Sequence, residues 1–214
     1  MTELPPDSGP VRLELGPAQW SDYFLEHWVA PGYSSFTLRD LPDLSRTEPR
    51  WINRFIMNST FMVSVADPQR GLLLNLCRRT ESAFDEYAHA NEALGELERT
   101  SRSTISPYFR AVRHLEAVIS NLDIGWALFG AVQGEKLFSR GDGSRLARLR
   151  KLHNASKHAD EHLQDGRAPK PSTLVVWVSN KAILAHDVEL THAEVAELMR
   201  MLAEAADQAV GLSA

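Results

Sequence analysis

The chain has 214 residues, of which 43% are apolar and 24% charged, and its formal net charge is −5. This length and composition suit a globular protein with a real core, and they exclude a largely disordered, collagen-like or disulfide-stapled chain. The single cysteine, Cys77, excludes an intrachain disulfide and a cysteine-based zinc site. The acidic balance argues against a globally basic nucleic-acid binder, so such binding would need a local basic patch.

The N-terminal sequence predicts neither export nor a membrane anchor. It opens MTELPPD, without the basic start and apolar run of a signal peptide. No stretch of the chain approaches the length that we expect for a membrane span. We therefore expect a cytoplasmic protein that does not bind a membrane.

Residues 1–46 are predicted to form an arm that lies on the main body. They contain six prolines, which interrupt regular structure. One amphipathic stretch, from Trp20 to Val29, carries large apolar residues at helical spacing. We expect one short helix there.

Residues 47–163 are predicted to form a helical bundle. Apolar residues at helical spacing begin near Trp51, and Asp67-Pro68 predicts a break followed by a second helix, with Asp as N-cap and Pro at the first helical position. The second helix is expected to end near Arg99. A similar Ser-Pro signal at 106–107 predicts a third helix, which ends at Gly134.

Residues 164–214 differ in composition from the bundle. A polar linker over 164–171 contains a glycine and two prolines, which a helix does not tolerate. The β-branched and aromatic runs Leu174–Val178 and Ile183–Leu190 predict a β-hairpin, and Thr191 with Glu194 predicts the capping box of a last helix. The predicted fold is mostly α: an antiparallel helical bundle with a C-terminal β-hairpin followed by a closing helix packed on the bundle.

The candidate site lies on a helix expected from Arg145 to Leu163, after a turn and N-cap at 141–144. Its apolar residues gather on one side, while Arg150, Asn154 and His158 follow one another at i, i+4 and i+8 on the other. Between 145 and 157 there are five basic residues and no acidic one: Arg145, Arg148, Arg150, Lys151 and Lys157. A solvated helix face gives the same pattern and remains the alternative.

These residue types can support metal-free RNA cleavage, in which a 2′-hydroxyl attacks its own phosphate. Histidine exchanges protons near neutrality, arginine holds a phosphate and stabilises developing charge, and asparagine orients the imidazole or the substrate. The same groups also suffice to bind a phosphate without cleaving anything.

The segment from Arg148 to His158, RLRKLHNASKH, resembles the motif helix of the HEPN superfamily (higher eukaryotes and prokaryotes nucleotide-binding). In that family an arginine is followed after four to six residues by a histidine, often with a polar residue directly after the arginine. Arg148 and His153 match this spacing, with Leu149 at the polar position. In the alternative register Asn154 is the polar residue and His158 the histidine, and His153 stands in place of the arginine.

The resemblance covers roughly residues 48–163 and implies a small, commonly dimeric bundle, of a kind that often acts as an endoribonuclease in toxin, antiviral or RNA-processing systems. The implied partners are RNA or a nucleotide and a second copy of the chain. The alternative is a non-catalytic module that binds a nucleotide or a protein partner. The implied catalytic residues are His158, Asn154, Arg150, His153 and Arg148, and the candidate phosphate-binding residues are Lys157, Lys151 and Arg145.

A pair of histidines raises the separate question of a metal site. His158 and His162 are spaced i, i+4, which can chelate zinc, but the metalloprotease motif needs a glutamate directly after the first histidine, where this chain has Ala159. Further ligands would have to come from residues that qualify by type alone: His89, His114 and Glu116. We predict no metal site and no cofactor.

Overall fold

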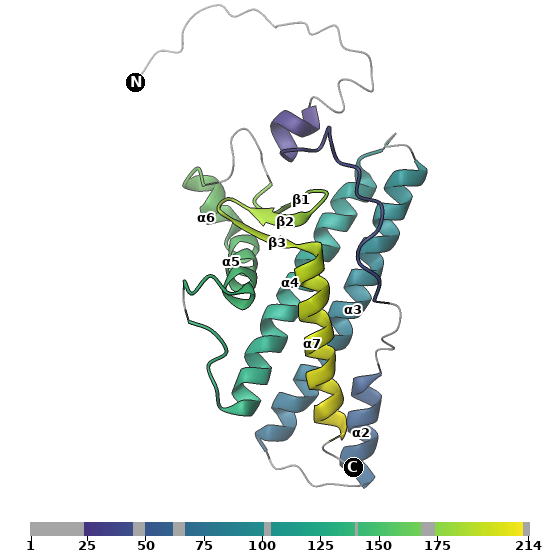
Figure 1. The fold of residues 1–214 in the computed structure, drawn as a ribbon, viewed down its shortest axis with the longest axis vertical. Helices are drawn as coiled ribbons and strands as arrows, with labels where there is room; N and C mark the ends of the chain where they lie inside the picture. Colours follow the sequence, from purple (N-terminus) through teal and green to yellow (C-terminus); the bar gives the residue numbers. More distant parts are fainter. Residues whose placement is uncertain are drawn as a thin grey trace, which may run out of the picture.

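The computed structural model describes residues 24–44, 50–61, 67–100, 104–139, 141–167 and 174–211. This part of the chain is 68% helical, with a small antiparallel sheet near the C-terminus and a closing helix after it, which confirms the predicted fold class (Figure 1). The elements in chain order are η1 (Leu25–Val29), α2 (Trp51–Phe61), α3 (Gln69–Arg99), α4 (Ser106–Gln133), α5 (Arg145–Lys157), α6 (Ala159–Gln164), β1 (Trp177–Val178), β2 (Ala182–Ala185), β3 (Val188–Thr191) and α7 (His192–Gly211).

The core of the bundle lies between α3, α4 and α7. Helices α3 and α4 pair along most of the molecule, and α7 packs on both of them, with α2 against α3 and α7 (Figure 1). The buried residues of each helix recur at helical spacing, so the apolar stripes of the sequence are the faces that the bundle buries. The largest fully buried aliphatic side chains of α3, α4 and α5 are Leu76, Leu94, Leu115, Ile119, Leu122, Leu149 and Leu152.

Helix α4 corrects the expectation that no stretch approaches a membrane span. By length and composition Ser106–Gln133 could cross a membrane, although half of its most apolar 18-residue window is buried inside the protein. Its contacts with α3, α5 and α7 are those of a core helix, which has a similar composition. It also carries the buried polar residues Asn121 and Asp123.

The N-terminal arm contacts the body through aromatic rings and through hydrogen bonds between its backbone and side chains of the body. The ring of Tyr108, on α4, lies edge-on to the rings of Tyr33 and Phe36, at centroid distances of 5.0 and 5.2 Å. Asn180, in the β1–β2 loop, accepts hydrogen bonds from the backbone N–H groups of Thr37 and Leu38. Of the helix expected over Trp20 to Val29, η1 forms the last five residues, and residues 20–23 lie outside the described part of the chain.

The predicted hairpin is wrong in one respect, because the structure has three strands. The second expected strand turns at His186 and Asp187, so β2 pairs with β3 through Ala185 and Val188 as well as with β1. His186 has a φ of 34°, in the left-handed region that tight hairpin turns require. The sequence signal was weak because glycine and asparagine, the usual residues of such turns, are absent there.

The single helix expected from Arg145 to Leu163 is also wrong. Helix α5 ends at Lys157, and His158, at φ −110° and ψ 37°, separates it from α6. The last turns of α5 contain Asn154 and Ser156, whose residue types are weak helix formers. The Ser156 hydroxyl donates a 2.9 Å hydrogen bond to Glu116 of α4.

The predicted helix ends are confirmed at three places. Gly134 ends α4 with a φ of 68°, and the Ser144 hydroxyl caps α5 by accepting from the Ala147 N–H. Thr191 and Glu194 form the capping box of α7, each side chain accepting from the backbone N–H of the other. The cap at Asp67-Pro68 is wrong, since α3 begins at Gln69 without a side-chain cap.

Candidate functional site

Helix α5 lies between the bundle and the sheet, and its contacts divide its polar residues into separate groups. Ala147, Leu149, Leu152 and Ala155 are buried against α4, β2 and β3. The basic side chains that the sequence predicted to form one patch therefore extend from different sides of this buried face. They form separate groups, and each group contacts different residues of the neighbouring elements.

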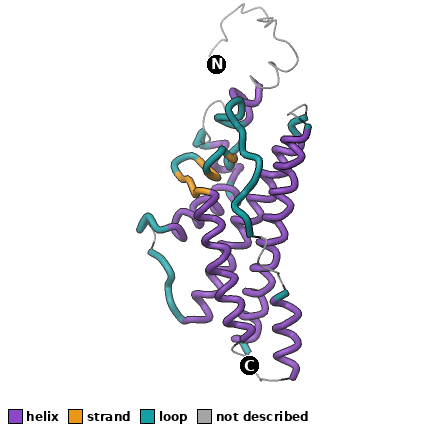
Figure 2. Tube along the Cα trace, turned by 45° about the vertical axis from the view of Figure 1, so that its right-hand side comes forward, coloured by secondary structure: helices purple, strands orange, loops and turns teal. Residues whose placement is uncertain are grey.

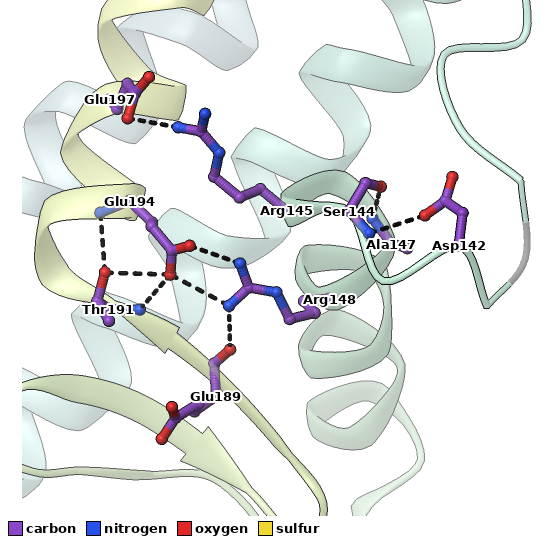
Figure 3. A network of polar contacts seen from close by, with 9 residues as sticks. All are labelled: Asp142, Ser144, Arg145, Ala147, Arg148, Glu189, Thr191, Glu194 and Glu197. Carbon is purple, nitrogen blue, oxygen red and sulfur yellow. Dashed lines mark hydrogen bonds and ion pairs between the residues drawn. The ribbon is translucent and has the colours of Figure 1, made fainter.

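Arg145 and Arg148 turn toward α7 (Figure 3). Both terminal nitrogens of Arg148 donate to the Glu194 carboxylate, at 3.1 and 2.5 Å, and one also donates to the Glu189 carbonyl of β3 at 2.9 Å. Arg145 pairs with Glu197, one turn further along α7. These two arginines join α5 to the closing helix, so their contacts are structural.

The Arg148 guanidinium holds the pKa of the Glu194 carboxyl at about 2, below its usual 4.5. The two charged groups are 29% and 24% exposed, so water only partly screens the pair. A carboxyl with a lowered pKa stabilises the fold above its ordinary pKa, and this stabilisation is lost as pH falls from about 4.5 to about 2.

We expect Arg148→Ala to lower the free energy of unfolding by about 1–3 kcal/mol at pH 7, because Glu194 loses a two-pronged charged hydrogen bond. The deficit should shrink as pH falls below 4.5, which urea denaturation at pH 7, 4 and 3 measures. Arg145→Ala is the matched control: its pair is more exposed, and its loss should change stability far less. Equal effects of the two variants would contradict this interpretation.

Arg150 and His153 converge on Asp123, a buried residue of α4. Nε of Arg150 donates to one carboxylate oxygen at 2.5 Å, and Nδ1 of His153 meets the other at 2.6 Å. The Asp123 side chain is 5% exposed, and that of His153 is 19% exposed. The carboxylate fixes the imidazole and leaves Nε2 as its other functional nitrogen, 3.5 Å from the Ser120 hydroxyl.

A cavity of about 990 Å³ lies between α5, the C-terminal half of α4 and the loop that joins them. Figure 2 shows the described parts of this loop in teal, on the outside of the bundle between the end of α4 and the start of α5. The α5 wall consists of residues at helical spacing, Ala147, Arg150, Lys151 and Asn154. The opposite walls include Trp126 of α4 and Lys136, Leu137 and Phe138 of the loop.

The walls of this cavity are apolar and aromatic, and most of its charges are basic. The guanidinium carbon of Arg150 lies 5.8 Å from the centre of the Phe138 ring. Trp126 is 6% exposed, and its indole N–H has no acceptor in the described part of the chain. This nitrogen has almost no solvent-accessible surface, so Trp126 contributes an apolar wall to the cavity rather than a hydrogen-bond donor.

The remaining candidate residues lie apart from one another. His158 pairs with Glu161 at 3.2 Å, its side chain is 44% exposed, and it does not line the cavity. Lys157 is exposed at the end of α5. Lys151 lines the cavity and approaches Asp187 of the sheet at 3.7 Å.

The structure thus brings together Arg150 and His153, and it separates Arg148 from both. In the register that pairs Arg148 with His153, the two side chains bind different carboxylates, on α7 and α4. In the register of Asn154 and His158, only Asn154 lines the cavity. The sequence analysis did not identify Asp123 as a site residue. The sequence offered one indication, since Asp123 is an acidic residue directly before a long apolar run of α4.

Comparisons of the chain with models of known protein families, with curated proteins and with solved structures find no match.

Proposed function

We propose that this protein is a helical module that binds a nucleotide, or a nucleotide unit of RNA, in the cavity between α4, α5 and their loop. The observation that carries the proposal is the combination of aromatic walls with a basic edge in one cavity of about 990 Å³. Ligand pockets typically measure about 300–1,000 Å³ and combine apolar walls with a few polar groups that orient the ligand.

The polar groups of the cavity suit a phosphate-bearing ligand. Among the described residues, its walls contain three basic side chains, Arg150, Lys151 and Lys136, against one acidic side chain, Glu135. Lysine and arginine attract a phosphate, and arginine can hold one with two hydrogen bonds. The partly exposed ring of Phe138 offers a surface on which a base can stack, and the edge of Trp126 adds an apolar wall.

The resemblance of residues 148–158 to the HEPN motif helix supports the same class of ligand, because Arg150 and Asn154 belong to that segment and line the cavity. A protein partner is the other occupant considered for this module. The concave shape of the cavity, with the loop after α4 as one wall, favours a small ligand over a flat protein surface. We place the protein in the cytoplasm as part of this proposal.

Calorimetric titration with nucleoside monophosphates and the matching nucleosides tests the proposal. We expect the phosphates to bind more tightly than the nucleosides, and the affinity to fall with added salt, because salt screens exposed charges. Lys151→Ala should weaken binding by about 5-fold, because it removes one of the basic side chains that line the cavity.

Lys181→Ala is the matched control, since Lys181 is an exposed lysine in the β1–β2 loop and does not line the cavity. Its affinity should equal that of the unmodified protein. If neither nucleotides nor short oligoribonucleotides bind at millimolar concentration, or if Lys181→Ala weakens binding as much as Lys151→Ala, the proposal fails.

The contact of His153 with Asp123 favours a second candidate function, metal-independent RNA cleavage. A carboxylate that fixes an imidazole, with an arginine beside it, supplies a proton acceptor and a cationic anchor for attack by a 2′-hydroxyl. The HEPN resemblance would then imply an endoribonuclease of a toxin or defence system. It would also imply a homodimer, in which two copies of α5 build one site.

A further inference from the structure

A second group of chemically active side chains lies on α3 and α4, away from the cavity beside α5. A pocket of about 300 Å³ there is lined by His89, Glu92 and Ala93 of α3 and by Arg110, Arg113 and His114 of α4. His114 and Asp123 are nine residues apart on α4, which is about 14 Å along the helix axis. The two sites are therefore separate.

Two of the residues that line this pocket, His89 and His114, form a group of potential metal ligands with Glu86. Glu86, His89 and His114 each offer one ligand atom, and the three atoms lie within 4.8 Å of one another. Oε2 of Glu86 and Nδ1 of His114 are 2.6 Å apart. The rings of His89 and His114 have centroids 5.2 Å apart and an angle of 42° between their planes.

The helices themselves hold this group in place. Glu86 and His89 are spaced i, i+3, which puts them on the same side of α3. His114 reaches them from α4, and the α3–α4 contact is the most extensive helix pairing in the described chain. Glu86 and His114 are partly buried, while His89 is exposed and free to rotate toward them.

We propose that Glu86, His89 and His114 bind a zinc ion through one carboxylate oxygen and two imidazole nitrogens. Zinc takes the place of the direct contact between Glu86 and His114. Zinc ligands stand about 2.0–2.2 Å from the ion, which puts tetrahedral neighbours about 3.3 Å apart. Glu86 and His114 have to separate slightly, and a rotation of the His89 side chain closes the remaining gap.

The donor set decides the class of ion. Two imidazoles and one carboxylate suit zinc and the neighbouring divalent transition ions, whereas magnesium and calcium require mostly oxygen ligands. Three protein ligands leave a fourth position for water or an anion. This proposal differs from our prediction from the sequence that no metal site exists, because the sequence did not indicate that Glu86 lies beside the two histidines.

Two arginines, Arg110 and Arg113, line the pocket beside the open fourth position of the proposed zinc site. Arg110 is held by Glu96 at 2.6 Å. Nη2 of Arg113 lies 3.4 Å from Nε2 of His114, and Arg113 is exposed, so it can move away when Nδ1 of that imidazole binds the ion. Two guanidinium groups beside a bound zinc would attract an anion to its fourth position.

Titration of the full chain with Zn²⁺, in competition with a chromophoric chelator, tests the site. We expect one equivalent to bind at micromolar concentration. His89→Ala and Glu86→Gln should each weaken binding by more than about 10-fold, since each removes one of three ligands. Co²⁺ in place of Zn²⁺ should give the intense visible absorption of a tetrahedral site, and His89→Ala should abolish it.

The control is a double variant of the other histidine pair, His158→Ala with His162→Ala, which should bind zinc as the unmodified protein does. Circular dichroism checks that each variant folds, and the exposure of His89 makes its substitution harmless to the core. The proposal is overturned if no zinc binds at micromolar concentration. It is also overturned if the affinity falls with the His158 and His162 variant and not with His89→Ala.

Discussion

Replacing Asp123 by alanine is expected to lower the free energy of unfolding by about 2–4 kcal/mol, the largest loss for any single charged residue considered in this protein. The carboxylate is buried and joins Arg150 and His153 of α5 to α4. Without this carboxylate, the side chains of Arg150 and His153 lose their hydrogen-bond acceptor, and the partly buried His153 is left without a charged partner. Chemical denaturation at pH 7 measures the difference.

Asp85→Ala provides the comparison, because Asp85 is an exposed aspartate of the neighbouring helix α3. It should change stability by less than about 0.5 kcal/mol. Asp123→Asn should fall between the two, since an amide keeps the volume but replaces one of the two oxygens that Arg150 and His153 contact by an NH₂ group, which cannot accept. A loss for Asp123→Ala no larger than that for Asp85→Ala would refute the role assigned to this contact.

The second expected result concerns RNA. If the purified protein cleaves RNA in the presence of EDTA, His153→Ala should lower the rate by about 10²- to 10⁴-fold, the usual contribution of a positioned acid or base. His153 is the imidazole that a buried carboxylate orients, and Arg150 binds the same carboxylate. Cleavage of mixed RNA, followed on a gel with and without EDTA, gives the rates.

His158→Ala is the matched control for this experiment. The sequence alone favoured His158, through its row with Arg150 and Asn154, whereas in the structure its side chain is half-exposed and bound to Glu161. Loss of cleavage in His158→Ala with full cleavage in His153→Ala would establish the sequence-based assignment instead. RNA left intact by the unmodified protein under all conditions would leave the nucleotide-binding module as the function to test.

Light scattering on the same preparation measures the homodimer that the ribonuclease hypothesis requires. A mass near twice 23.9 kDa supports a site built from two copies. A mass near 23.9 kDa at every concentration would remove that support, and it would leave the cavity of a single chain as the binding site.

The local features of this fold could be predicted because they depend on neighbouring residues. Helical periodicity identified the long helices, and the caps at Ser144 and Thr191 were confirmed because a capping residue acts on N–H groups two or three positions away. The break at His158 and the turn at His186 were missed. Both depend on the backbone angles of a histidine, a residue type with no strong preference for these conformations, so its presence in the sequence does not predict them.

The sequence by itself determined that this protein is a helical bundle with a strongly basic helix, since periodicity and charge are properties of the chain. Only the tertiary structure decided what that helix does with its charges. Arg148 forms a salt bridge with Glu194, which is 46 residues away in the chain, and His153 contacts Asp123, which is 30 residues away. No local pattern encodes such pairs, because they form only where the packing of α4, α5 and α7 brings distant side chains within hydrogen-bond distance.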